Sequence, residues 1–280
     1  MKEKLLWPNC ASFLLICLLF SSAAFAQTAA EKRGKQIVDE AVAALGGEKF
    51  LTMEDRVESG RAYSFYRDQL TGLSIAKIYT RYLTVANGKS GEDIGQRERQ
   101  AFGKNEDTSV LFTENAGWEI SWRGSKDMAK ERYDRYRETT LRNVLYIFRQ
   151  RLHEPGMIFE SRGTDVFENL PVEIVDITDS QNRVVTVYFH QSTKLPVRQL
   201  YVWANPETKQ RDQETTHFAR YREVDGVQWP YEITRERNGE KIYQIFSESV
   251  LINRDLTDNL FTPPGPGETV QKPPAKSVRH

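Results

Sequence analysis

The sequence has little cysteine and no net charge, and it has no long apolar run outside its first 26 residues. Its two cysteines, Cys10 and Cys17, both lie in that opening stretch. Once this stretch is removed, no thiol remains for a disulfide, a metal site or a nucleophile, so the chain must fold on its core alone. Basic and acidic side chains are equal in number, 39 of each, and nothing global points to nucleic acid.

The opening stretch itself has the order of a secretory signal peptide. Lys2 and Lys4 precede an apolar run from Phe13 to Phe20, and Ala24-Phe25-Ala26 supplies the small residues that a signal peptidase reads. The run is shorter than the ~20 residues that a membrane-spanning helix needs. We therefore expect residues 1–26 to be removed after Ala26 and the protein to act in the periplasm. The alternative is an uncleaved anchor.

The clearest structural pattern is a meander from Gln213 to Asn253. Asp225-Gly226 and Asn238-Gly239 separate three runs rich in aromatic and β-branched residues. Both dipeptides accept the positive φ angles of type I′ turns, so they predict two consecutive hairpins. In the middle run Trp229, Tyr231 and Ile233 alternate with polar residues, which is typical of a half-buried antiparallel strand.

Helical periodicity occurs at two further places. Apolar residues recur at helical spacing over Glu31–Leu45, and Gly46-Gly47 ends that helix. A second apolar stripe predicts one long helix within Ser125–Leu152, ended by Pro155-Gly156 and about 40 Å long at ~1.5 Å per residue. A short helical turn is expected near Asp255–Leu260.

The remaining patterned segments are strand-like, and we predict about ten strands in all. Before the meander they lie near residues 56–67, 74–85, 97–103, 108–122, 158–168, 171–178, 183–190 and 196–204. Tight connections between them favour antiparallel pairing, because parallel strands need long crossovers.

So many antiparallel strands must curl, and the long helix needs an apolar surface to cover. The predicted fold class is therefore α+β, mainly antiparallel β, with a curved half-closed β-barrel and the long helix against its concave face. It would occupy residues 27–262 as one domain, followed by a disordered proline-rich tail at 263–280. A membrane-spanning barrel is excluded, because strands such as 217–223 and 231–237 carry too many charges for a lipid-facing band.

The order of several motifs resembles the LolA/LolB-like periplasmic lipoprotein-sorting family. The motifs are Ala44-Leu45-Gly46-Gly47, Leu170-Pro171-Val172, Leu195-Pro196-Val197, Asp225-Gly226-Val227 with Pro230, and Ile252-Asn253 through Leu260-Phe261. The resemblance covers most of the chain after residue 26. It implies an incomplete antiparallel barrel, LolA-like in fold, that carries acyl chains in an apolar cavity without catalysis and without a cofactor. Lys194 stands where relatives often have glycine, and no individual functional residue is carried over.

No motif for catalysis or metal binding is complete. Gly88-Lys89-Ser90 has Leu83 where a phosphate-binding loop begins with glycine, and the histidines show no metal-ligand pairing. Acidic pairs such as Asp176 and Asp179 are as compatible with solvated turns as with acid/base chemistry. We expect no catalytic residues, no metal and no enzyme.

Two groups of residues are candidates for binding. The candidate cavity wall joins the helix stripe to the middle strand of the meander, and its members are Leu141, Val144, Leu145, Phe148, Trp229, Tyr231 and Ile233; equally, they are core. The segment Arg123–Arg151 holds nine basic and four acidic residues. Arg132, Arg135 and Arg142 on it are candidates for docking an acidic partner or anionic lipid head groups, and the alternative is a solvated helix face.

The leading functional hypothesis is a periplasmic carrier or chaperone for lipid or lipoprotein acyl chains. Its partners would be those acyl chains, with an envelope protein as a further possibility and no nucleic acid. A periplasmic sensor or protein-interaction module with the same fold is the alternative. An exported hydrolase is third, because no activated nucleophile is present.

Overall fold

The computed structural model describes residues 28–84, 93–205 and 208–265. The predicted signal peptide and nearly all of the predicted tail lie outside these residues. No helix in the described part of the chain is long and apolar enough to cross a membrane.

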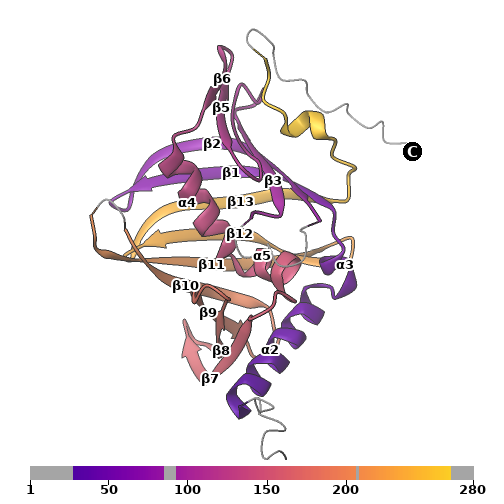
Figure 1. Ribbon diagram of the computed structural model, residues 1–280, viewed down its shortest axis with the longest axis vertical. Coiled ribbons are helices and arrows are strands. Elements are labelled where there is room, and N and C mark those ends of the chain that lie inside the picture. Colours follow the sequence, from indigo (N-terminus) through magenta and orange to yellow (C-terminus); the bar gives the residue numbers. More distant parts are fainter. Residues whose placement is uncertain (1–27, 85–92, 206–207, 266–280) are drawn as a thin grey trace, which may run out of the picture.

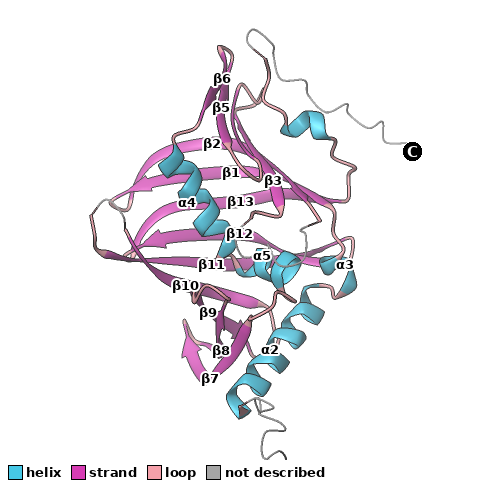
Figure 2. Ribbon diagram, viewed as in Figure 1, coloured by secondary structure: helices cyan, strands magenta, loops and turns pink. Residues whose placement is uncertain are grey.

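The described residues form one antiparallel sheet of thirteen strands with the α-helices on one face (Figure 2). The strands are β1 (Asp55–Tyr66), β2 (Gln69–Tyr82), β3 (Gln96–Phe102), β4 (Thr108–Phe112), β5 (Gly117–Ser121), β6 (Gly124–Asp127), β7 (Ile158–Phe167), β8 (Leu170–Thr178), β9 (Val184–His190), β10 (Pro196–Ala204), β11 (Arg211–Val224), β12 (Val227–Arg237) and β13 (Glu240–Ile252). The predicted strand at 108–122 is two strands, β4 and β5, joined by a tight turn.

The sheet runs in the order β6-β5-β4-β3-β2-β1-β13-β12-β11-β10-β9-β8-β7. Two meanders therefore meet at the centre, where β1 pairs with β13, and the two outer strands, β6 and β7, do not pair with each other. The sheet curves around the helices α4 (Lys130–Leu141) and α5 (Val144–Tyr146) (Figure 1). This is the predicted fold class, a half-open barrel with a helix against its concave face.

Both predicted hairpin turns of the meander are confirmed. Asp225 and Gly226 have φ angles of 52° and 85°, and Asn238 and Gly239 have 53° and 83°. Positive φ at both central residues is what a type I′ turn requires. These turns set the register of β11, β12 and β13.

The first predicted helix is α2 (Ala29–Leu45), followed by the short α3 (Glu48–Leu51). Thr28 and Glu31 form a reciprocal capping box at the start of α2. Gly34 lets the helix approach β7 closely, because a Cβ at this position would lie 2.5 Å from the carbonyl oxygen of Phe159. The prediction for this segment is confirmed.

The prediction of one long helix over 125–152 is wrong. Its start is strand β6, and the rest is α4 (Lys130–Leu141), α5 (Val144–Tyr146) and a π-helical turn, η2 (Ile147–Arg151). The chain breaks at Arg142 and Asn143, where the Asn143 side chain accepts hydrogen bonds from the N–H groups of Leu145 and Tyr146. An asparagine in this position starts a new helix, and α2 is consequently the longest described helix.

Apolar side chains cover both faces of the sheet. On the concave side, α2, α5 and η2 pack against β8, β9, β12 and β13 in the largest core cluster. On the convex side of β1–β5, a smaller cluster is closed by Leu256, Leu260 and Phe261 from the C-terminal segment with its turn η3 (Asp258–Phe261). The expected helical turn near 255–260 is therefore present and contributes to the core.

Candidate functional site

Strand register shows which polar side chains face the helices. Tyr133 of α4 packs on Val110 and Phe112 of β4, so residues paired directly with these two lie on the concave face. Following the pairs through β3, β2, β1 and β13 places a set of largely polar side chains beneath the helices: Glu98, Gln100, Thr80, Ile78, Arg56, Glu58, Val250 and Ile252. The concave face of this half is thus largely polar.

One end of the concave face opens into a cleft of about 1220 Å³. It lies where β2 ends, between α3, η2 and the segment 255–258. Its apolar floor consists of Leu51, Tyr82, Phe148, Leu152 and Leu256. Its charged rim consists of Glu54, Asp55, Arg81, Arg149, His153, Glu154, Asp255 and Asp258. This volume is above the range of roughly 300–1,000 Å³ that is typical of ligand sites.

Arg149 is the lining residue of the end cleft that contacts both Tyr82 and the backbone. Its guanidinium lies 5.0 Å from the ring centroid of Tyr82, and its Nε donates to the carbonyl of Met53 at 2.9 Å. Burial raises the pKa of the Tyr82 hydroxyl, whereas the charges of Arg56 and Arg149 act to lower it. The ring therefore stays neutral and offers an apolar surface with a polar tip.

A second hollow, of about 520 Å³, lies at the opposite end of β3, between the β5–β6 hairpin and the start of α4. Phe102 and Val110 line it from the sheet, and Arg132 lines it from α4. The two hollows are separated by the length of β3, roughly 20 Å at ~3.3 Å per residue. We refer to them as the end cleft and the hairpin pocket.

Glu98 occupies the strip of concave face between the two hollows. Gln100 donates to one carboxylate oxygen of Glu98 at 2.6 Å, and the nearby Gln96 donates to the Tyr136 hydroxyl at 3.0 Å. Burial raises the pKa of the Glu98 carboxyl, although Gln100 and Arg56 act in the opposite direction. Its side chain is nevertheless only half-buried, like that of Tyr136, so this strip lies deep in the protein without being fully packed.

Arg56 is the central cation of the concave face. Its guanidinium lies 3.9 Å from the ring centroid of Trp229, and it donates to Thr80 at 2.9 Å and approaches Glu58 at 3.8 Å. Within the described part of the chain, Arg56 Nε and Trp229 Nε1 have no hydrogen-bond partner. Buried donors without partners are costly, so they are places where a polar ligand atom would be stabilised.

Glu214 on β11 carries a second charged cluster. Its carboxylate accepts from the Tyr201 hydroxyl at 2.9 Å and pairs with Arg235 and Arg237 at 2.9 and 2.8 Å. Burial acts to raise the pKa of Glu214, but the two arginines together lower it below the ordinary value. The two arginines share one carboxylate, so each charged group of this cluster has a partner, and the cluster is best explained as structural.

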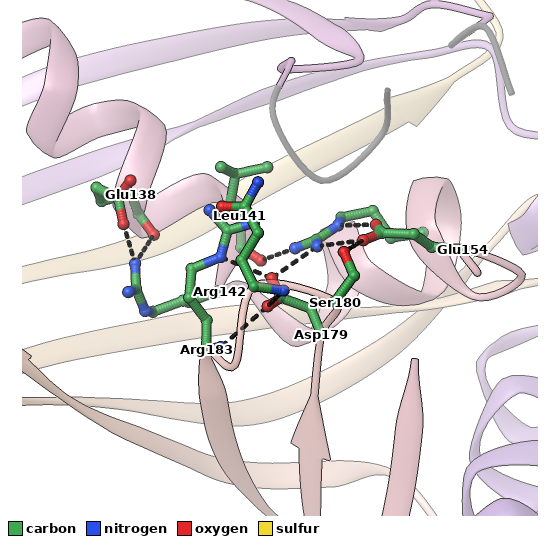
Figure 3. Close-up of polar contacts among 9 residues, drawn as sticks. Glu138, Leu141, Arg142, Glu154, Asp179, Ser180 and Arg183 are labelled. Carbon is green, nitrogen blue, oxygen red and sulfur yellow. Dashed lines mark hydrogen bonds and ion pairs between the residues drawn. The ribbon is translucent and has the colours of Figure 1, made fainter. Parts of the chain in front are cut away.

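A buried network of ion pairs holds η2, the helical turn that contains Phe148 (Figure 3). Asp179, in the β8–β9 turn, accepts from Arg151 at 2.8 Å and from Arg183 at 2.6 Å. Arg151 also donates to Glu154 at 2.6 Å. Burial acts to raise the pKa of Asp179, but its hydrogen bonds with the two arginines lower it overall. The network holds η2 in place at the edge of the end cleft.

Most of the predicted cavity-wall residues meet in one core cluster. Val144, Leu145, Phe148, Trp229 and Tyr231 are all buried there, with Ile233 packed against them. Leu141 instead packs with Ile94 and Tyr146 in a separate cluster. Of the seven, Phe148 lines the end cleft.

The three predicted docking arginines lie on or next to α4 and have different surroundings. Arg132 pairs with Glu119 and is half exposed. Arg135 lies 5.9 Å from the ring centroid of Trp203. Arg142 pairs with Glu138 and keeps only 11% of its side chain exposed. They do not form one continuous basic face.

Sequence reasoning missed Arg56, Glu58 and Glu98. Their strands alternate polar and apolar residues, and such alternation normally places the polar side chains in solvent. Here the apolar positions face the C-terminal segment on the convex side, and the polar positions face the helices. The sequence contains no signal that distinguishes these two assignments.

Comparison with solved structures finds the same fold in distant proteins. A DUF1329 family protein from Desulfovibrio piger matches with a TM-score of 0.57 and 15% identity, over 84% of this chain and 98% of that one. An outer membrane lipoprotein-sorting protein domain from Vibrio parahaemolyticus matches with a TM-score of 0.50 and 12% identity, over 82% and 97%. A LolA superfamily protein from Nitrosomonas europaea matches at 0.49 and 12%, over 82% and 97%.

No family model matches the sequence, and no curated protein matches it. At these identities the structural likeness concerns the fold alone. The predicted resemblance is confirmed at that level: the chain has the open, curved-sheet fold of the lipoprotein-sorting domains.

Proposed function

We propose that this protein is a periplasmic carrier or chaperone that binds the acyl chain of a lipid or lipoprotein, without catalysis. The observation that supports it most directly is the arrangement of the concave face. Two hollows lie at its ends, and the half-buried strip between them runs beneath α4. The lipoprotein-sorting fold adds support, because it sets a curved sheet against helices in the same way.

In this proposal the acyl chain lies along β3, between the sheet and α4. Phe148, which is buried but lines the end cleft, contacts it there, and the buried Val144, Leu145 and Trp229 form the packed wall behind. Each methylene removed from water contributes about 0.8 kcal/mol. Entry requires α4 to move, since this helix covers the strip.

The test is native mass spectrometry of the protein purified gently from its own host. A mass excess that matches a phospholipid or an acylated peptide supports carriage and identifies the ligand class. A bare polypeptide mass, together with no uptake of an added fluorescent fatty acid, rejects the proposal. Phe102→Ser, at a half-buried position that lines the hairpin pocket, is the variant to compare, with the half-buried Phe246→Ser on the convex face as its matched control.

A further inference from the structure

The hairpin pocket combines an apolar floor with a basic rim. Phe102 and Val110 form the floor. Arg123 and Lys126 from the β5–β6 hairpin and Arg132 from α4 form the rim. Such a composition suits a molecule with one anionic end and one apolar end.

The charge of this rim is only partly neutralised, because its three cations face one carboxylate, Glu119, which is also the cross-strand neighbour of Lys126. Glu119 is the one carboxylate in the pocket lining, and it pairs with Arg132. Arg123 and Lys126 are exposed and make no ion pair with any described residue. Arg123 instead lies over the ring of Trp122, 4.7 Å from its centroid. Two positive charges therefore face the open pocket and attract anions.

The end cleft has the opposite character. Five carboxylates, two arginines and one histidine line it. The carboxylates belong to Glu54, Asp55, Glu154, Asp255 and Asp258. Glu154 and Asp258 are paired with arginines, so the end cleft attracts an anionic group less than the hairpin pocket does. The two ends of the concave face are electrostatically distinct, which gives a bound amphiphile one preferred direction.

The apolar floor continues from the pocket toward the strip beneath α4. Phe102 and Val110 belong to the cluster in which Phe112 stacks on Tyr136, with ring centroids 3.7 Å apart. Phe102 is only half-buried. A free inorganic anion would leave this apolar surface uncovered, whereas an acyl chain attached to the anion would bury it.

We infer that the hairpin pocket binds the anionic head group of an acyl amphiphile whose chain runs from Phe102 beneath α4. This inference rests on the proposed function and adds a ligand class and a direction of binding. Arg123 and Lys126 contact the head group, and Arg132 supports it while paired with Glu119. Charge-assisted contacts of this kind confer specificity for the head group more than affinity for the chain.

The experiment measures binding of two ligands with the same acyl chain, lysophosphatidylglycerol and lysophosphatidylcholine, to the protein expressed from its full sequence. We expect at least a tenfold preference for the anionic lipid at low salt, and a smaller preference at high salt. The double variant Arg123→Gln/Lys126→Gln should lose that preference and keep its affinity for the zwitterionic lipid. Lys32→Gln/Arg67→Gln, at exposed positions on α2 and in the β1–β2 turn, is the matched control, since Arg67 lies over the ring of Tyr66 as Arg123 does over Trp122.

A fatty acid compared with its fatty alcohol then distinguishes a carboxylate from a phosphate as the recognised anion. Equal affinity of the unmodified protein for both lysolipids overturns the inference and leaves the carrier function intact. The inference is also overturned if the double variant keeps its preference for the anionic lipid, or if it loses affinity for both lysolipids equally. Failure of the unmodified protein to bind any of these lipids rejects the carrier function itself.

Discussion

The side chain of Gln199 on β10 bridges the break before Val144. Its amide oxygen accepts from the Val144 N–H at 2.7 Å, and its amide nitrogen donates to the carbonyl of Arg142 at 3.2 Å. One buried side chain therefore provides hydrogen-bond partners for a backbone carbonyl at the end of α4 and a backbone N–H at the start of α5. Helix ends leave such backbone groups without intrahelical partners, so this contact allows the chain to turn toward the end cleft.

Replacing Gln199 with leucine should lower the free energy of unfolding by about 2 kcal/mol, because two buried backbone groups lose their partners. Urea denaturation followed by fluorescence measures the change. Gln244→Leu is the control, since Gln244 makes one side-chain bond, to the partly exposed Glu232. A loss no larger than that of the control would show that Gln199 does not hold the break.

Removal of the Asp179 carboxylate should lower the free energy of unfolding more than Gln199→Leu does. Asp179→Asn leaves Arg151 buried with one partner fewer, and loss of one member of a buried ion network costs roughly 3–5 kcal/mol. Arg162→Gln, at an exposed ion pair, should cost less than about 1 kcal/mol. Equal effects in thermal unfolding at pH 7 would argue against a structural role for the network.

Asp179 also predicts an acid-sensitive stability. Its pKa is lower in the folded protein than in the unfolded chain. Its contribution is therefore fully present above the unfolded value of about 3.9 and is lost as the pH falls through the folded value. Asp179→Asn should flatten the decline of unfolding free energy below pH 4, and an unchanged decline would contradict this assignment.

Glu98 predicts the opposite pH dependence. Burial raises its pKa in the folded state, so its ionisation costs stability as the pH rises through that value. Glu98→Gln should raise the melting temperature at pH 7 and have little effect at pH 3.5, where the native side chain is already neutral. The comparison is a pair of thermal melts at the two pH values; stabilisation confined to acid pH would reverse the argument.

Gly34 tests the close contact between α2 and β7. Glycine to alanine in a helix normally stabilises by up to ~1 kcal/mol. At this position the added methyl would meet the backbone of Phe159, and overpacking costs about 1–3 kcal/mol. Gly34→Ala should therefore lower the unfolding free energy, whereas Gln36→Ala on the solvent side of the same turn should leave it nearly unchanged. A stabilised Gly34→Ala would show that the helix can shift without penalty.

Local chemistry accounts for the parts of the fold that the sequence predicts well. The turns at 225–226 and 238–239 depend on residues that accept positive φ, and α2 depends on its own cap and its terminal glycine. The break after α4 is different, because its hydrogen-bonding partner, Gln199, lies 55 residues from Val144. Periodicity within one segment carries no information about such a partner.

The site was predictable only in its apolar part. Val144, Leu145, Phe148, Trp229 and Tyr231 follow from the helical and alternating patterns, and they do meet in one cluster. The end cleft and the hairpin pocket depend on where strands end relative to helices, which strand patterns do not specify. The position of Arg56 and Glu98 beneath the helices could not be predicted from the sequence, because both faces of β1–β3 are covered.

The central pairing of β1 with β13 has a consequence for the order in which the chain can fold. Glu54 N–H donates to the side chain of Asn253, 199 positions later, and Leu256, Leu260 and Phe261 complete the convex cluster on β1–β5. The pairing of β1 with β13 and the packing of the segment after β13 therefore form only after both have been synthesised. Contacts so distant in sequence form slowly. During synthesis one edge of β1 and the convex face of β1–β5 should stay uncovered until almost the whole chain has emerged, so ribosome-bound fragments ending before β13 should be protease-sensitive.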